Sequence, residues 1–338
     1  MIRINRILCP TDMSSDADQA LRYALALAHA YEAQLVVCYR PDHGELAGAA
    51  AIQEGPVPDA LVPQKGKEIF EPALLKFHAP HDKSKLNWQG LLMQGEEVGE
   101  AITRTASECA ADLIVMRSRR RPHRAALLGS TAESVCRTAP CPVLVTHIDE
   151  RDWVQPLTRS ISPQRVLVPY DFSDYSELAL NYALSFAQEY QAELHLLHVL
   201  PPRTVNEPEI AWYPNESESA YHNAARRLQG AVPSEAHLWC QVKHAVSGGQ
   251  PYREILNYAE KHAIDLISLG AHGAGFGMRT LFGSNVDRVL RQAPCPVLVA
   301  RPLKPAVREN LASDRVNSCA DGILRTETSR CRQDSMGV

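Results

Sequence analysis

The feature that most constrains the fold of this chain is an internal repeat. The segment RILCPTDMSSDADQALRYALALAHAYEAQL, from Arg6, aligns without gaps with RVLVPYDFSDYSELALNYALSFAQEYQAEL, from Arg165. A second pair follows in the same order: GSTAESVCRTAPCPVLV from Gly129 and GSNVDRVLRQAPCPVLV from Gly283. One unit of roughly 150 residues therefore occurs twice. We expect a first half at 1–148, a linker at 149–164, a second half at 165–302, and a disordered tail at 303–338.

The same alternation of patterns runs through each half. Short apolar runs such as Ile7–Pro10 and Leu35–Tyr39 are typical of buried strands, and segments with helical spacing separate them. Strands that are apolar along their whole length and alternate with helices predict a parallel sheet covered on both faces. The sequence thus predicts α/β architecture, with two tandem doubly wound five-stranded parallel-sheet domains. The polar stretches 41–80 and 201–233 show no clear period, and we interpret them as irregular lids over the binding edge.

Composition excludes several classes of function. Of the 338 residues 45% are apolar and 22% are charged, and the formal net charge is −4. This balance provides no basic surface for nucleic acid, and no apolar window is long enough to span a membrane. Without a signal-like N-terminal segment we expect a cytoplasmic protein. Nine cysteines form no C-x-x-C pair, so we expect them to be reduced and mostly buried.

Glycines cluster after the fourth predicted strand of the second half. Gly270 is followed after two residues by Gly273, and after nine more by Gly283 and Ser284. In a doubly wound sheet this loop lies beyond the carboxyl ends of the strands, where ligands bind, and Asp171 lies on the same edge. Glycines permit positive φ angles or a close approach of the backbone, and the start of the next helix favours an anion. The pattern predicts a phosphate-binding loop.

Together with Asp171 after RVLVPY and the closing APCPVLVAR, this loop resembles the ATP-binding branch of the universal stress protein family. The resemblance covers both halves and implies an adenine nucleotide alpha hydrolase-like fold. It implies that Asp171 contacts the nucleoside, that the main chain of Val199 borders the adenine, and that Gly270, Gly273, Gly283 and Ser284 surround the phosphates. It also implies ATP as the ligand, with or without Mg²⁺. His272 and Arg279 are candidates for neutralising the phosphates.

The first half departs from this pattern. Arg117 stands where the second half has Gly270, Arg120 replaces Gly273, and Arg40 replaces Val199. Asp12, Gly129 and Ser130 are retained, so a smaller anion could still bind at the helix end. We expect the arginines to close the pocket to a triphosphate. The run Arg117, Arg119, Arg120, Arg121 and Arg124 is either a solvated basic loop or a docking patch for an acidic or phosphate-bearing partner.

The two units are expected to pack face to face as a pseudo-dimer within the chain. The resemblance implies that the last strand, CPVLV, pairs them. Whether two chains also form a homodimer is not determined by the sequence. His195 and His198 should point to opposite faces of one strand and cannot share a metal. Three functions remain: a nucleotide-binding regulatory module acting on an unknown protein partner, a weak ATP-hydrolysing or phosphotransfer enzyme, or a nucleotide-independent adaptor. No catalytic base, nucleophile or metal set is evident, so an enzyme is the less favoured of these.

Overall fold

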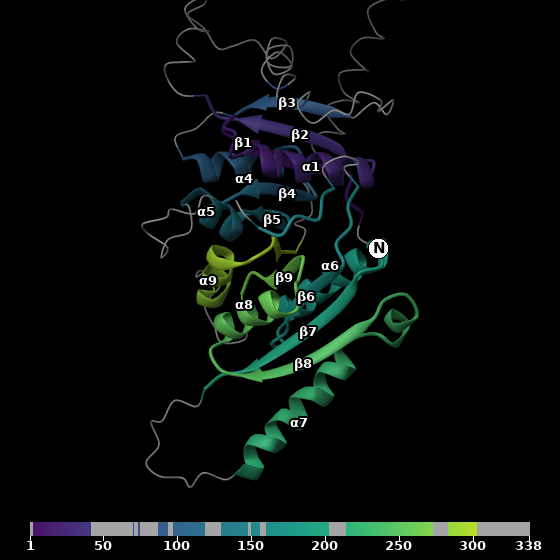
Figure 1. The fold of residues 1–338 in the computed structure, drawn as a ribbon. Coiled ribbons are helices and arrows are strands. Elements are labelled where there is room, and N and C mark those ends of the chain that lie inside the picture. The colour runs from purple at the N-terminus through teal and green to yellow at the C-terminus, as the bar shows by residue number, and fades with distance from the viewer. Residues whose placement is uncertain are drawn as a thin grey trace, which may run out of the picture. The chain divides into compact units, whose positions relative to one another are not determined.

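The computed structural model describes residues 3–41, 70, 74, 87–93, 97–118, 130–147, 150–155, 160–202, 214–272 and 283–302. Ten strands of this part of the chain alternate with helices (Figure 1). The strands are β1 (Arg6–Thr11), β2 (Gln34–Tyr39), β3 (Trp88–Leu92), β4 (Leu113–Arg117), β5 (Val143–Thr146), β6 (Arg165–Pro169), β7 (Glu193–Leu200), β8 (Val242–Gly248), β9 (Leu266–Gly270) and β10 (Val297–Ala300). The helices are α1 (Asp18–Ala30), α4 (Val98–Glu108), α5 (Ser130–Thr138), α6 (Asp174–Tyr190), α7 (Pro214–Ala231), α8 (Pro251–Lys261) and α9 (Ser284–Gln292), with a 3₁₀ helix η1 (Ser234–Leu238).

Both halves have the same strand order. The sheet runs β3-β2-β1-β4-β5 in the first half and β10-β9-β6-β7-β8 in the second, and every pairing within a half is parallel. The strand order reverses between β1 and β4, and again between β6 and β9. The predicted doubly wound α/β fold is confirmed, and these two switch points are where such sheets bind ligands.

The halves join edge to edge. Strand β10 pairs with β5 in antiparallel register, with Leu298 opposite Leu144, so the two sheets continue into each other. The expected pairing through CPVLV is confirmed, but the expected face-to-face packing of the two units is wrong. The physical reason is that β5 and β10 are buried along their whole length, and an unpaired strand edge would leave backbone N–H and C=O groups without partners. Residues 1–303 consequently form one compact unit.

Helices cover both faces of the continuous sheet. One core contains α1, α6 and α7 with alternate strand residues such as Ile7 and Cys9, and the other contains α4, α5, α8 and α9 with residues such as Leu8. Successive strand residues point to opposite faces, which explains why β1 contributes to both cores. His195 on β7 contacts Tyr258 of α8 on one face, and His198 contacts Phe172 on the other, so their predicted opposite orientation is confirmed.

The segment after β5 contacts both halves. The Trp153 ring packs edge-on against Tyr23 of α1 at 4.6 Å and against Phe186 of α6 at 5.7 Å. The Arg151 side chain donates to the carbonyl oxygen of Ile264 at 2.6 Å, and Arg301 donates to that of Cys136 at 2.7 Å. Arg151 of the linker therefore hydrogen-bonds to backbone of the second half, and Arg301 of the second half hydrogen-bonds to backbone of the first.

An aspartate anchors the first strand of each half in the same way. Asp112, just before β4, accepts hydrogen bonds from the backbone N–H groups of Asn5 and Arg6 at 2.8 and 3.0 Å. Asp265, just before β9, accepts from Gln164 and Arg165 at the same two distances. This repeated contact sets the start of β1 beside β4 and of β6 beside β9.

One element was not anticipated from the sequence. Part of the stretch 201–233, for which we expected no regular structure, forms the helix α7, and its Ala224 and Leu228 are buried against β7 and β8. Only a few small apolar side chains mark the buried face of α7, which is why its periodicity was weak. The expected lid at 41–80 and the tail at 303–338 lie outside the described residues, apart from Pro41, Phe70 and Leu74.

The expectation of reduced cysteines agrees with the structure. Cys9, Cys38, Cys136, Cys141, Cys240 and Cys295 are buried and unbridged, and Cys109 is half-buried; Cys319 and Cys331 lie outside the described part. Burial raises the pKa of the Cys9 and Cys136 thiols to about 12. Thiols of this kind are not reactive sensors.

Within the described residues, no helix has both the length and the apolar character needed to cross a bilayer.

Candidate functional site

A cavity of about 390 Å³ opens at the carboxyl ends of β6, β7 and β9 in the second half. Five of the six predicted site residues line it together: Asp171, Val199, Gly270, Gly283 and Ser284. His272 lines it as well. Gly273 and Arg279 lie outside the described residues. Side chains that are up to 113 positions apart in the sequence thus meet at the switch point of the sheet.

Asp171 organises the turn between β6 and α6. Its Oδ1 accepts hydrogen bonds from the backbone N–H of Ser173 at 3.1 Å and from the Ser173 hydroxyl at 2.5 Å. Phe172, between them, has a φ angle of 65°, a conformation that costs energy for a residue with a side chain. Asp171 is not the N-cap of α6, because Ser173 caps this helix in a capping box with Ser176. Asp171 instead fixes the residue that caps the helix.

The two described glycines of the loop have different reasons to be glycine. A Cβ on Gly270 would lie 2.6 Å from the carbonyl oxygen of Tyr175 in the first turn of α6, so no larger residue fits there. A Cβ on Gly283 would meet its nearest neighbour, Val286, at 3.4 Å, and Gly283 has an ordinary φ of −59°. Neither residue has a positive φ. Gly270 is required by helix packing, whereas Gly283 leaves the start of α9 without a side chain over it.

The start of α9 forms one wall of the cavity. Gly283 is its N-cap and supplies no side-chain hydrogen bond to the first helical N–H groups, and Ser284 beside it is exposed. Uncapped N–H groups at a helix start attract anions. In the described lining Asp171 carries the only formal charge, so the positive end of α9 and His272 are the groups that face an anion.

The lining also includes an apolar wall. Val199, Pro251, Ile255 and Leu269 provide a surface on which a flat aromatic group can stack. Only Val199 was predicted; the other three come from α8 and β9, and nothing in the local sequence marks them as lining residues.

His198 is a further lining residue that sequence reasoning considered only as a metal ligand. Its Nδ1 lies 2.7 Å from the carbonyl oxygen of Tyr170, so Nδ1 carries the proton and donates. Its ring packs on Phe172 at 4.7 Å, and the guanidinium of Arg227 of α7 lies 3.7 Å from the centre of the Phe172 ring. Its position directly before Val199 was the available signal. Helix α7 therefore contacts the turn that holds Asp171.

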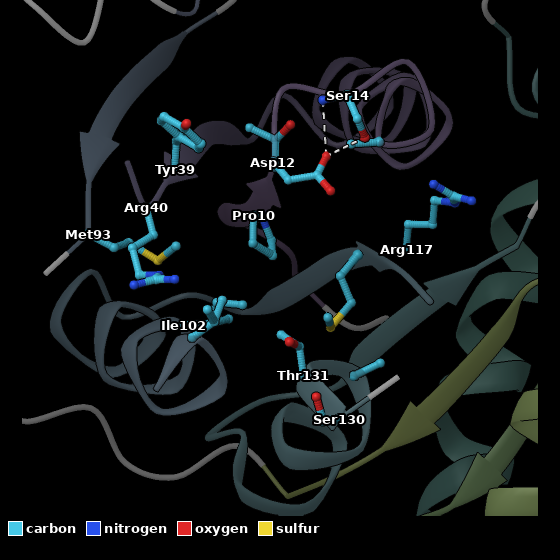
Figure 2. A pocket seen from close by; sticks show the side chains of 15 residues that line it. Pro10, Asp12, Ser14, Tyr39, Arg40, Met93, Ile102, Arg117, Ser130 and Thr131 are labelled. Atoms are coloured by element: carbon cyan, nitrogen blue, oxygen red, sulfur yellow. Dashed lines mark hydrogen bonds between the residues drawn. The ribbon is translucent and has the colours of Figure 1, made fainter. Parts of the chain in front are cut away.

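The first half contains a corresponding cavity, and it is larger. Its volume is about 560 Å³, and its lining includes Asp12, Arg40, Arg117, Ser130 and Thr131 (Figure 2). Asp12 repeats the role of Asp171, because its Oδ1 accepts from both the backbone N–H and the hydroxyl of Ser14. Arg40 and Arg117, two of the arginines that we expected to close this pocket, line it and leave it open. Gly129 and the other arginines of the loop, Arg119, Arg120, Arg121 and Arg124, lie outside the described residues.

Arg117 leaves the cavity open because its guanidinium forms an ion pair with Asp16. Its Nη1 lies 2.9 Å from Asp16 Oδ2, and Figure 2 shows the side chain directed away from Ser130 and Thr131. By the repeat alignment Asp16 corresponds to Tyr175, whose backbone packs on Gly270. Helix α6 starts at Asp174, but α1 starts only at Asp18, three residues later in the alignment. Without that first helical turn the first half has room for an arginine.

A cluster of titratable groups lies at the opposite edge of the second half, near the starts of β7 and β8. Glu193 contacts Lys243 at 2.5 Å and His195 at 3.2 Å, and His195 Nδ1 lies 3.0 Å from the Tyr258 hydroxyl. Burial raises the pKa of Glu193, but the hydrogen bonds from Lys243 and His195 outweigh it, so this pKa ends below its ordinary value. Burial lowers the pKa of His195, against the opposing effect of Glu193.

In the ranges that the structure describes, no group of three or more His, Cys, Asp or Glu side chains is arranged to hold a metal ion. This result covers His237, Cys240 and His244, which lie close together in the sequence. His78, His81 and Asp82 lie outside the described part.

Comparison with known proteins agrees with this geometry. The profile of the universal stress protein family matches residues 3–147 and 163–301. A universal stress protein of Mycolicibacterium smegmatis is 28% identical over 307 residues, which cover 88% of this chain and 97% of the relative. One of Mycobacterium tuberculosis H37Rv is 29% identical over 306 residues, covering 87% and 96%.

A solved structure extends the likeness to the fold. The universal stress protein from Archaeoglobus fulgidus has a TM-score of 0.57 at 23% identity, covering 89% of this chain and 99% of that one. At that identity the likeness concerns the fold alone. Since the profile matches twice, and each match contains the same five-stranded sheet with a cavity at its switch point, the chain belongs to the universal stress protein family and carries two tandem copies of its fold.

Proposed function

We propose that the second half is an adenine-nucleotide-binding module with ATP as its ligand, and that nucleotide occupancy regulates contact with a protein partner. One observation carries the proposal: Asp171, Val199, Gly270, Gly283 and Ser284 surround a single cavity of about 390 Å³. A volume in the range of about 300–1,000 Å³ is typical of small-molecule sites. We further propose the division into domains at 1–148 and 165–302 with a linker at 149–164.

The lining suits the parts of a nucleotide. The apolar wall of Val199, Pro251, Ile255 and Leu269 fits a base, and main-chain groups of Val199 can recognise its edge. The Asp171 carboxylate can accept hydrogen bonds from ribose hydroxyls. The start of α9, with Gly283 and Ser284, can hold phosphate oxygens through N–H groups and a hydroxyl. Gly273 completes the predicted loop.

Charge balance supports Mg²⁺ as a companion of the nucleotide. The described lining has one carboxylate and no lysine or arginine, so the helix start and His272 are left to balance a triphosphate. A divalent ion bound to the phosphates themselves would supply the remaining positive charge.

A regulatory role follows if binding changes a surface. Phe172, next to Asp171, contacts both His198 in the cavity wall and Arg227 on α7. A ligand that moves this turn changes the position of α7. Such a shift requires only that the ligand binds one arrangement more tightly than the other.

The decisive experiment separates the two roles of Asp171. Mass spectrometry of small molecules released from the denatured purified protein should detect adenine nucleotide, and calorimetry should show saturable ATP binding. Asp171→Asn keeps an oxygen acceptor for Ser173 but removes the charge, so the fold should survive. ATP affinity should fall about tenfold or more, the effect of losing a hydrogen bond to a charged group.

Matched variants complete the test. Asp12→Asn makes the same change in the first half and should leave ATP affinity unchanged, while Gly273→Arg should abolish binding. Absence of both retained nucleotide and saturable ATP binding would refute the proposal. Equal losses from Asp12→Asn and Asp171→Asn would show that the binding site is not confined to the second half.

The enzyme alternative has less support. The Oδ1 of Asp171, the one carboxylate in the described lining, is already committed to Ser173, and a phosphate-releasing enzyme would need a group that positions water. Multi-turnover phosphate release that Ser284→Ala abolishes would replace the regulatory proposal. The adaptor alternative predicts that neutralising Arg117, Arg119, Arg120 and Arg121 destroys function while Asp171→Asn does not.

A further inference from the structure

The cavity of the first half has the size of a ligand site but not the lining of its counterpart. It measures about 560 Å³ against about 390 Å³ in the second half. Its described lining contains Arg40, Arg117 and Asp12, a formal sum of +1, whereas that of the second half contains Asp171 alone, −1. The two cavities therefore favour ligands of different charge distribution.

Arg40 is the distinctive group. It replaces Val199 at the end of the second strand, and its Nε atom is buried without a hydrogen-bond partner in the part of the chain that the structure describes. Arg117 is paired with Asp16, but among the described residues no carboxylate pairs with Arg40. A buried donor left without an acceptor destabilises the fold, and more so when the group is charged. An oxyanion in the cavity would satisfy it.

Part of the lining of this cavity is apolar. Met93, Ile102 and Met116 line the same cavity and are 6%, 1% and 4% exposed. Figure 2 shows Arg40 on the opposite side of this cavity from Arg117. Methionine side chains are flexible and adapt to ligands of varied shape. Arg40 is half-buried, and a guanidinium that is partly shielded from water makes a stronger charge-assisted hydrogen bond than one in bulk water.

We infer that the first half binds a small organic anion other than ATP, with an apolar body held by Met93, Ile102 and Met116 and one oxyanion head, carboxylate or phosphate monoester, held by Arg40. This second ligand class goes beyond the proposed function, because it concerns the other half of the chain. The protein would then respond to two unlike small molecules through two copies of one fold.

The test uses the full chain with ¹³C-labelled methionine methyl groups. The probes are 3-phenylpropionate, phenyl phosphate and the neutral 3-phenylpropionamide. The anions should shift the Met93 and Met116 signals saturably, and the amide should bind at least tenfold more weakly. The tighter of the two anions identifies the preferred head group.

Two variants assign the effect. Arg40→Met should weaken binding of both anions about tenfold or more, the loss expected for a charge-assisted hydrogen bond, without affecting the amide. Arg104→Met removes an arginine from the exposed face of α4 and should change nothing. If Arg40→Met does not fold, the comparison of acid with amide on the unmodified chain decides.

Three results would overturn the inference: no shift of Met93 and Met116 with either anion, equal binding of amide and acid, or anion affinity unchanged in Arg40→Met. Displacement of the probes from Met93 and Met116 by ATP would also overturn it, since the cavity would then be a second nucleotide site. Failure of ATP to bind in the second half leaves each of these readouts intact.

Discussion

The two halves have the same sheet and the same turn after the first strand, but they differ in the residues beside that turn. We call these differing residues, at the carboxyl ends of the strands, the rim residues. In both, an aspartate after the first strand accepts two hydrogen bonds from a serine two residues later, and the residue between them has a positive φ, 60° at Met13 and 65° at Phe172. Beside this common turn, one half has Gly270 under the first turn of α6, and the other has Arg117 paired with Asp16. The strained turn persists in both halves although the residues around it have diverged.

The difference shows that the rim residues change as sets. Gly270 belongs with an early helix start, which Ser173 and Ser176 stabilise through a capping box. In the first half Ala17 stands at the position of Ser176, α1 has no side-chain cap, and the vacated space contains an arginine. Replacing one member of a set without the others should therefore be costly, and the following predictions use that asymmetry.

The largest effect is expected from Gly270→Arg, which gives the second half the residue of the first. The new side chain would collide with the Tyr175 backbone, and overpacking of this kind costs about 2–4 kcal/mol. Urea unfolding measures the loss. Gly283→Ala is the matched control and should cost no more than about 1 kcal/mol, the difference between a good cap and alanine at an N-cap, because its Cβ finds space. Similar losses from both would mean that Gly270 is not a packing glycine.

The repeated aspartate contact before β4 and β9 predicts equal effects in the two halves. Asp112→Ala and Asp265→Ala each remove the acceptor of two backbone N–H groups and should each cost about 1–3 kcal/mol. Urea unfolding of the two variants should agree to within about 0.5 kcal/mol. A large difference would show that the repeated contact does not have the same weight in both halves.

A smaller effect distinguishes the helix starts. Ser173→Ala removes the cap of α6 and should cost about 1 kcal/mol. Ser14→Ala, at the aligned position, should cost less than half of that, since Ser14 does not cap α1 and within the described residues its hydroxyl bonds only Asp12. Thermal unfolding of the pair provides the comparison, and equal costs would contradict the different capping of α1 and α6.

The smallest effect is a pH dependence that involves His195 of the second half. His195 has a pKa below its ordinary 6.5, so the folded state binds fewer protons than the unfolded state and loses stability as the pH falls below about that value. Glu193, with its lowered pKa, adds a further loss only at more acidic pH. His195→Val, which copies Val36 of the first half, should flatten the fall in urea midpoint between about pH 7 and about pH 5.

The slope should not vanish in His195→Val, because burial also lowers the pKa of His244 and His262. Val36→Ile, a conservative change at the aligned position of the first half, is the control and should leave the slope as it is. An unchanged slope in His195→Val would remove His195 from the explanation.

Much of the fold and part of the site were predictable. The apolar runs around Leu8 and Leu167 and the repeat itself determine a parallel α/β sheet, because no other arrangement buries strands on both faces. Asp171, Gly283 and Ser284 were predictable as neighbours since strand ends of such a sheet meet at one edge. Helix α7 was missed because its buried face consists mainly of small residues, and His198 was considered only with His195 as a metal ligand, not as a neighbour of Val199.

By itself, the sequence determined the repeated architecture and the polar residues that follow the carboxyl ends of the strands. Both depend on local periodicity and on the order of elements. Only the tertiary structure decided that the sheets join edge to edge, that Gly270 is required by Tyr175, and that Arg117 turns toward Asp16 so that the cavity beside Arg40 stays open. These outcomes depend on distances between atoms far apart in the chain, and residue identity alone does not specify those distances.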